Sequence, residues 1–126
     1  MSEMMTEVSK GRLFVPLSSE PYSWFLSGEK RWELRRYGRQ YTVAHVREGR
    51  QVELRLGYRS QQQSLWGHIV RTVEANSLDS FFKEVPFRLV IPIAKSLEEA
   101  VRQASFILGI APHEQTRVLG FEVEIH

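Results

Sequence analysis

The hydrophobic positions of this chain follow two periods, and each period predicts a different kind of element. Tyr22, Phe25 and Leu26 fall at the spacing of one helical face, after a serine, an acid and a proline of the kind that begin helices. Gly28 stands where a left-handed residue would end this helix, which the pattern places at about residues 20–27. The sequence therefore predicts a short helix with these three residues on its apolar side.

Alternation with a period of two predicts the strands. Trp32 and Leu34 alternate with charged residues, which is the pattern of a strand with one buried face. On a later strand Trp66 and His68 share a face, and we expect them to be core residues. The predicted strands lie at residues 13–15, 31–35, 41–46, 52–56, 66–73 and 118–125, with turns of glycine and polar residues between them.

Two further helices are predicted after the central strands. One begins at Ser77 and is stopped by Pro86. The other has a capping box formed by Ser96 and Glu99, keeps helical spacing of its apolar residues, and ends at Gly109. Short strands at close spacing, combined with two or three helices, indicate an α+β fold built on a small barrel or curled sheet.

The composition fits one soluble domain. The chain has 126 residues, 42% of them hydrophobic, so it can bury roughly two-thirds of its unfolded surface in one core. It has no cysteine, which excludes a disulfide framework, a thiolate metal site and a cysteine nucleophile. No apolar run approaches the length of a membrane span. We therefore predict a flexible tail at residues 1–10, a single domain at residues 11–126, a cytoplasmic location and no membrane partner.

The small net charge hides an uneven distribution. The whole chain is +2, but residues 28–59 contain nine Lys or Arg against four acids, which makes this segment +5. Thirteen of the seventeen basic residues are arginine, whose planar fork of donors suits phosphate and stacks on bases. This favours a polyanion or a nucleotide as ligand. The alternative is a solvated strand face whose arginines pair with Glu33, Glu48 and Glu53.

Several kinds of chemistry leave no sign in the sequence. There is no glycine-rich phosphate loop of the nucleoside triphosphatase or dinucleotide-binding type. The four histidines have no metal-ligand spacing. We therefore predict neither a metal nor another cofactor.

One segment combines charged residues in a way that suggests a site. Gly28 lets the backbone reverse after the first helix, Lys30 follows at the mouth of the next strand, and Glu33 and Arg35 project from one face of that strand. A lysine beside an acid in a partly desolvated cleft can bind phosphate or, with a lowered pKa, take up protons. The alternatives are a helix-capping role for Lys30 and ordinary ion pairs for Glu33 and Arg35.

This segment resembles the G-x-K-x-x-E-x-R motif of the ASCH superfamily, at Gly28, Lys30, Glu33 and Arg35. The order of the predicted elements over residues 12–125 is also similar to that of the family. The resemblance implies a PUA-like fold, with a partly closed small β-barrel of five to seven strands and two or three helices.

The same resemblance implies a role connected with RNA, because PUA-like domains commonly bind it. We therefore expect a protein that binds single-stranded RNA or a nucleotide-like small molecule, such as a modified nucleoside, at residues 28–35. The alternative is a metal-independent hydrolase, with Lys30 and Glu33 as catalytic residues. Some members of the family are ribonucleases, and some small bacterial members resemble amidohydrolases that deacetylate modified cytidine. The latter have a threonine where this chain has Glu33.

Four residues outside the motif are further candidates for ligand contact. Trp24 lies off the apolar face of the first helix and is a candidate for stacking on a base. Arg55, Tyr58 and Arg59 form an arginine and aromatic mixture suited to single-stranded nucleic acid, and they would serve equally as a polar loop. A third interpretation is that the domain is a protein-interaction module, in which the basic strands bind another protein.

Overall fold

The structure is a computed structural model that describes residues 11–58 and 63–126. The predicted tail at residues 1–10 and the candidate Arg59 lie outside the described residues. Within the described part, five strands, three α-helices and one 3-10 helix form an α+β fold. In chain order these elements are β1 (Arg12–Leu17), α2 (Ser19–Ser27), β2 (Trp32–Arg36), β3 (Gln51–Leu56), β4 (Ser64–Ala75), α3 (Leu78–Glu84), η1 (Phe87–Leu89), α4 (Leu97–Leu108) and β5 (Val118–Ile125).

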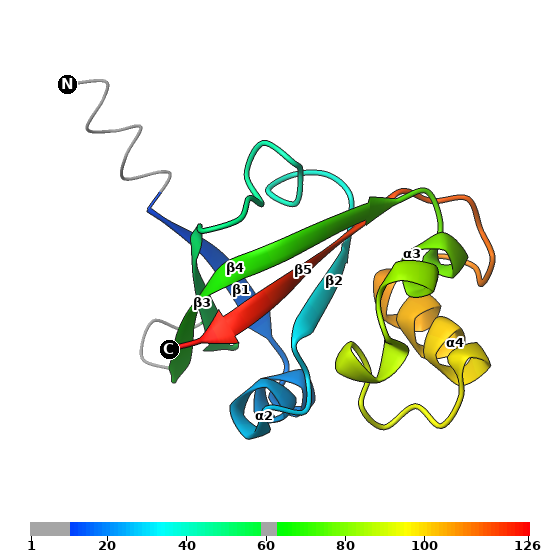
Figure 1. The fold of residues 1–126 in the computed structure, drawn as a ribbon. Coiled ribbons are helices and arrows are strands. Elements are labelled where there is room, and N and C mark those ends of the chain that lie inside the picture. Colours follow the sequence, from blue (N-terminus) through cyan, green and yellow to red (C-terminus); the bar gives the residue numbers. More distant parts are fainter. Residues whose placement is uncertain (1–10, 59–62) are drawn as a thin grey trace.

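The five strands make one mixed sheet in the order β1-β3-β4-β5-β2. Strands β1 and β3 are parallel, and every other pair is antiparallel. The sheet curls into a half-barrel, with α2 at one end and with α3 and α4 beside β2 (Figure 1). This is the partly closed barrel that the PUA-like resemblance implied. Its open side is the gap between the two edge strands, β1 and β2, which we call the seam.

The sheet separates two hydrophobic cores. One fills the half-barrel between β1, β3 and helix α2, with Phe25 and Phe121 among its largest members. The other lies between β2, α3 and α4, where Trp32 and Leu34 contribute the apolar residues of β2. Gly120 is paired with Leu34, and an added Cβ there would lie 2.3 Å from the ring of Phe81, so this glycine makes room for the helix above it.

Most of the predicted elements are confirmed. The strand at 118–125 matches β5 and the capping-box helix matches α4, in which the Ser96 hydroxyl accepts a hydrogen bond from the Glu99 N–H at 3.1 Å. The αL conformation at Gly28, with φ of 87°, ends α2 as expected.

The strand predicted at residues 41–46 is wrong. The carbonyl of Thr42 accepts hydrogen bonds from the N–H groups of both His45 and Val46, which closes a helical turn instead of a ladder. Only Val46 of this run is buried, whereas Val43 is half exposed. The β-branched residues have the composition of a strand, but the N–H groups of Tyr41, His45 and Val46 are bonded locally and not to a neighbouring strand.

Two core assignments are also wrong. Leu26 is 65% exposed, although it shares helical spacing with the buried Tyr22 and Phe25. Trp66 is 40% exposed on the outer face of β4, and the His68 imidazole contacts His126 at 3.1 Å near the surface. The inner face of this strand is instead supplied by Gly67 and Ile69. None of the helices in the described part of the chain has the length and apolar character that crossing a membrane requires.

Candidate functional site

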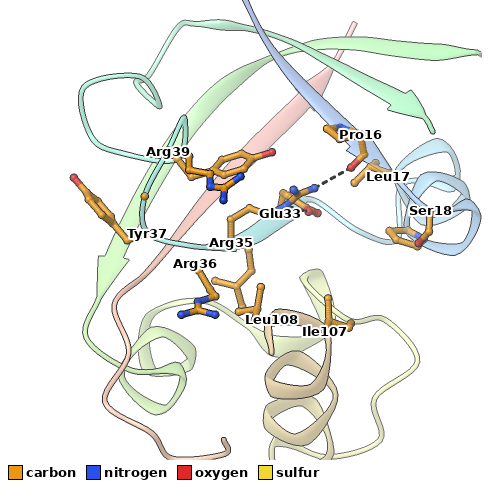
Figure 2. A pocket seen from close by; sticks show the side chains of 14 residues that line it. Pro16, Leu17, Ser18, Glu33, Arg35, Arg36, Tyr37, Arg39, Ile107 and Leu108 are labelled. Carbon is orange, nitrogen blue, oxygen red and sulfur yellow. Dashed lines mark hydrogen bonds and ion pairs between the residues drawn. The ribbon is translucent and has the colours of Figure 1, made fainter. Parts of the chain in front are cut away.

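Side chains, rather than a backbone ladder, connect the two edge strands across the seam. The Arg35 guanidinium on β2 donates a hydrogen bond to the Pro16 carbonyl on β1 at 3.0 Å. Just beyond β2, the Gln40 amide donates to the Phe14 carbonyl at 2.8 Å. A cavity of about 730 Å³ opens here between the end of β1, strand β2 and the last turn of α4 (Figure 2). We call it the seam cleft.

Three charged side chains of the predicted motif meet at the inner end of this cleft, and we call them the floor charges: Glu33 and Arg35 line the cleft, and Lys30 lies behind Glu33 in a smaller cavity. The Glu33 carboxylate accepts a hydrogen bond from Arg35 Nε at 2.7 Å and lies 3.5 Å from Lys30 Nζ. Lys30 Nζ also donates to the carbonyl of Val90 at 2.6 Å. Lys30 is 6% exposed and Glu33 is 7% exposed, so both are buried. The structure thus brings together the motif residues, and the charged face of β2 is turned inward rather than toward solvent.

The local sequence explains this arrangement. Glu33 is paired with Phe121 across the β2–β5 ladder, so its side chain points to the same interior side as the Phe121 ring. Gly28 reverses the chain after α2, and the Lys30 N–H donates to the Trp24 carbonyl at 3.1 Å, which brings Lys30 back beside the helix. The Lys30 ammonium then lies 5.4 Å from the ring centroid of Phe25. Its partners are Glu33, Val90 and this ring, not the carbonyls at the end of α2.

The charges of the floor perturb one another. Burial lowers the pKa of Lys30, and the Glu33 carboxylate opposes that effect only in part. For Arg35, burial also acts to lower the pKa, but Glu33 and the neighbouring tyrosines outweigh it and the net pKa is raised. The protonated form of Lys30 is therefore less favoured than it is in water, whereas Arg35 beside it stays charged.

A smaller cavity of about 70 Å³ lies behind Glu33, and we call it the slot. Lys30 and Trp24 line it, together with apolar residues of α2, β2, α4 and the segment that follows η1. Its volume is that of a small chemical group rather than of a nucleobase. Trp24 is half-buried against the α3 and α4 core, so this candidate stacking residue reaches the ligand region only through the slot.

The seam cleft also contains residues that the sequence analysis did not select. Arg36, Tyr37, Arg39 and Tyr41 line it, and all follow directly after the motif. Figure 2 shows Arg36 and Arg39 extending on either side of Arg35. The run of arginines and tyrosines around Gly38 was the available signal, but the strand predicted at 41–46 placed these residues on an ordinary turn.

Tyr41 is unusual among the lining residues. Its hydroxyl is buried and has no hydrogen-bond partner of normal geometry in the described part of the chain. Burial raises the pKa of Tyr41, while Arg35 and Gln40 oppose that rise. The Arg35 guanidinium lies over the Tyr41 ring, 4.9 Å from its centroid.

The remaining candidates from the sequence lie apart from the floor. Tyr58 is 79% exposed and does not line the cleft; it acts on Arg35 and Tyr41 electrostatically, raising the pKa of both. Arg55 is on β3 and does not line the cleft; its guanidinium is ion-paired with the buried Glu53 at 2.5 Å. Within residues 11–58 and 63–126, no three His, Asp or Glu side chains are grouped as metal ligands.

Three solved structures are similar to this chain over most of its length. The hypothetical protein PH0355 matches with a TM-score of 0.73 and 18% identity, over 91% of this chain and 99% of that one. Protein PF0455 from Pyrococcus furiosus matches with a TM-score of 0.65 and 18% identity, over 90% of this chain and 96% of that one. The ASCH protein from Zymomonas mobilis matches with a TM-score of 0.60 and 10% identity, over 91% of this chain and 68% of that one.

These identities are low, so the comparisons concern the fold. No protein-family model and no curated protein matches the sequence.

Proposed function

Because this chain has the fold of an ASCH domain, we propose that it binds RNA or a modified nucleoside in the seam cleft. The observation that carries the proposal is the cluster of Lys30, Glu33 and Arg35 at the cleft floor, where two of the three side chains are buried. Buried ion pairs are often no more stabilising than apolar residues of similar size. A fold that keeps three such charges at a cavity therefore supports a ligand role for them.

The size and charge of the cleft support the same ligand class. A volume of about 730 Å³ is in the range of pockets that hold ligands of nucleotide size. Four cationic side chains, Lys30, Arg35, Arg36 and Arg39, lie along the two cavities against one carboxylate, Glu33. This excess of positive charge favours an anionic ligand.

Binding of fluorescently labelled, mixed-sequence single-stranded RNAs, followed by anisotropy at several salt concentrations, tests the proposal. We expect binding at low salt that weakens with salt, with a log–log slope of about −0.7 for each phosphate contact. Lys30→Met should weaken binding, whereas the matched variant Lys83→Met, on the exposed side of α3, should not. No binding at low salt to RNA or to a panel of modified nucleosides, or affinity for RNA that is independent of salt, would contradict the proposal.

A second candidate function is hydrolysis of RNA or of an acylated nucleoside. It is favoured by the lowered pKa of Lys30, because a buried amine 3.5 Å from a carboxylate is suited to accepting and returning a proton. Glu33 would hold the resulting ammonium. The threonine of the family's amidohydrolase-like members is absent, since Glu33 occupies its position, and this departure counts against the deacetylase form of the reaction.

Incubation of the protein with RNA and with acylated nucleosides, in the presence of a chelator, tests the catalytic candidate. We expect product formation that is lost in Lys30→Ala and in Glu33→Gln and retained in Lys83→Ala. Turnover that survives both substitutions at the floor would show that these residues are not the catalytic ones.

A further inference from the structure

We propose that the seam cleft recognises a phosphate group of its ligand, and that Arg39 and Arg36 at the cleft mouth bind it. This inference rests on the proposed function and specifies it: the ligand is a nucleotide or an RNA segment rather than an uncharged nucleoside. Neither arginine belongs to the G-x-K-x-x-E-x-R motif, and the two lie on either side of Arg35 (Figure 2).

The charges of the floor are already engaged, which is the first argument. Arg35 donates from Nε to Glu33 and from one terminal nitrogen to the Pro16 carbonyl, and the Lys30 ammonium contacts Glu33 and the Val90 carbonyl. A phosphate at the floor would have to displace these contacts or approach the Glu33 carboxylate. The floor is therefore suited to the uncharged part of the ligand, and the phosphate must be bound elsewhere.

The arginines of the mouth are available. Arg39 makes no hydrogen bond or ion pair with any residue of 11–58 or 63–126, and it lines the cleft. The backbone of Arg36 is part of the β2–β5 ladder, but its side chain lines the cleft and makes no hydrogen bond or ion pair within those ranges; it only attracts Glu114 at longer range. Guanidinium groups match the geometry of phosphate oxygens and form charge-assisted hydrogen bonds with them.

The backbone at Arg39 is the second argument. Arg39 is at the tip of a tight turn, between Gly38 and Tyr41, that is closed by hydrogen bonds of 3.0 and 2.8 Å. Its φ is 54°, a region that residues other than glycine rarely occupy. Glycine would suit this position better, and the arginine is retained at some cost to stability. Such costs are typical of residues that a ligand requires.

The third argument is the unused hydroxyl of Tyr41 at the other end of the same turn. The Tyr41 ring lines the cleft beneath the Arg35 guanidinium, while the hydroxyl itself is buried, so the ring must turn toward the cleft for the ligand to reach it. A sugar or phosphate oxygen placed between the turn and the floor would satisfy it. The turn thus offers a cation at its tip and a hydrogen-bond donor at its base, which together suit the phosphate and sugar of one nucleotide.

Isothermal titration calorimetry with paired ligands tests the inference. The probes are the four nucleosides, their 5′-monophosphates, inorganic phosphate, and short single-stranded RNAs of mixed sequence. We expect at least one monophosphate, or the RNA, to bind about tenfold or more tightly than the corresponding nucleoside. Preference for the monophosphate identifies a free nucleotide as the source of the phosphate, and preference for the RNA identifies its backbone.

Three variants assign the contact. Arg39→Gly should reduce the advantage of the phosphorylated ligand over the nucleoside by about tenfold, while its midpoint of urea unfolding stays at or above that of the native protein. Arg36→Ala should reduce the same advantage. Arg102→Ala, an exposed arginine on α4 outside the cleft, is the matched control and should change neither quantity.

The outcomes separate this inference from the proposed function. If nucleosides bind but phosphorylated ligands bind no more tightly, or if both arginine variants keep the full advantage, the phosphate site is wrong and the cleft function stands. If no nucleoside, nucleotide or RNA binds, the proposed function itself is wrong, and the phosphate site fails with it.

Discussion

The three charges at the cleft floor are not equivalent, because only Glu33 contacts both of the others. Removing Lys30 leaves Glu33 paired with Arg35, whereas removing the charge of Glu33 leaves two cations facing each other in a buried place. Glu33 therefore contributes more to the free energy of unfolding than either of the two cations. Charge alternation in the sequence could not indicate this, since it does not tell which charged face will be covered.

We expect Glu33→Gln to lower the free energy of unfolding by about 3 kcal/mol, the usual cost of leaving buried charge uncompensated. Lys30→Met should cost about 1 kcal/mol, because the Val90 carbonyl loses its donor but the apolar stem is kept. Urea unfolding measures both values. The double variant, with both Glu33→Gln and Lys30→Met, should lose less free energy of unfolding than the two single variants added together. Equal losses for the two single variants would contradict the central role of Glu33.

At the scale of elements, the best predictions came from segments whose start and stop residues are both local. Helix α4 has its capping box and its terminal glycine within the segment, and both work as expected. The run at 41–46 was misread because a local hydrogen-bonding pattern at Thr42 competes with strand pairing. The parallel pairing of β1 with β3 could not be predicted, since it joins strands separated by a helix, a strand and the turn that carries Arg39.

The approach of α3 to β5 gives a prediction at this scale. Gly120→Ala would place a Cβ 2.3 Å from the Phe81 ring, so the helix or the ring must shift. We expect a loss of about 1 to 3 kcal/mol in the free energy of unfolding, the usual cost of overpacking a core. Urea unfolding of the alanine variant, alone and combined with Phe81→Leu, measures it.

The combined Gly120→Ala and Phe81→Leu variant provides the control. The alanine should cost less when the smaller leucine side chain has replaced the ring. If its cost is the same in both backgrounds, the clash with Phe81 is not its cause.

At the scale of the whole molecule, a second buried carboxylate joins three strands. Glu53 on β3 accepts hydrogen bonds from Arg12 on β1, from Arg55 on its own strand and from Ser64 on β4. Burial acts to raise the pKa of Glu53, but these hydrogen bonds and the arginine charges lower it to about 2. Glu53, one of the acids that could pair with the basic strands, holds the sheet together away from the cleft.

The pH dependence of unfolding in acid should reveal how much the Glu53 carboxylate contributes to stability. Because its pKa falls on folding, the stabilisation is complete above its ordinary value of 4.5 and is lost as the pH falls toward about 2. The difference in free energy of unfolding between the native protein and Glu53→Gln should shrink by about 3 kcal/mol between pH 6 and pH 2. Urea titrations over this range measure it.

Glu98→Gln, on the exposed side of α4, is the matched control for that experiment and should show little change with pH. A difference between the native protein and Glu53→Gln that is constant with pH would contradict the assignment.

The walls of the seam cleft come from parts of the chain that are distant in sequence: Pro16 to Ser18, the residues 33–41, and Ile107 with Leu108. A compound that binds there contacts all three segments at once, including the first strand and the last helix. These segments separate when the protein unfolds. Binding therefore raises the free energy of unfolding, by about 2.7 kcal/mol when the free compound is at one hundred times its Kd. A plain melting-temperature screen of metabolite mixtures would thus reveal the physiological occupant without any assay for turnover.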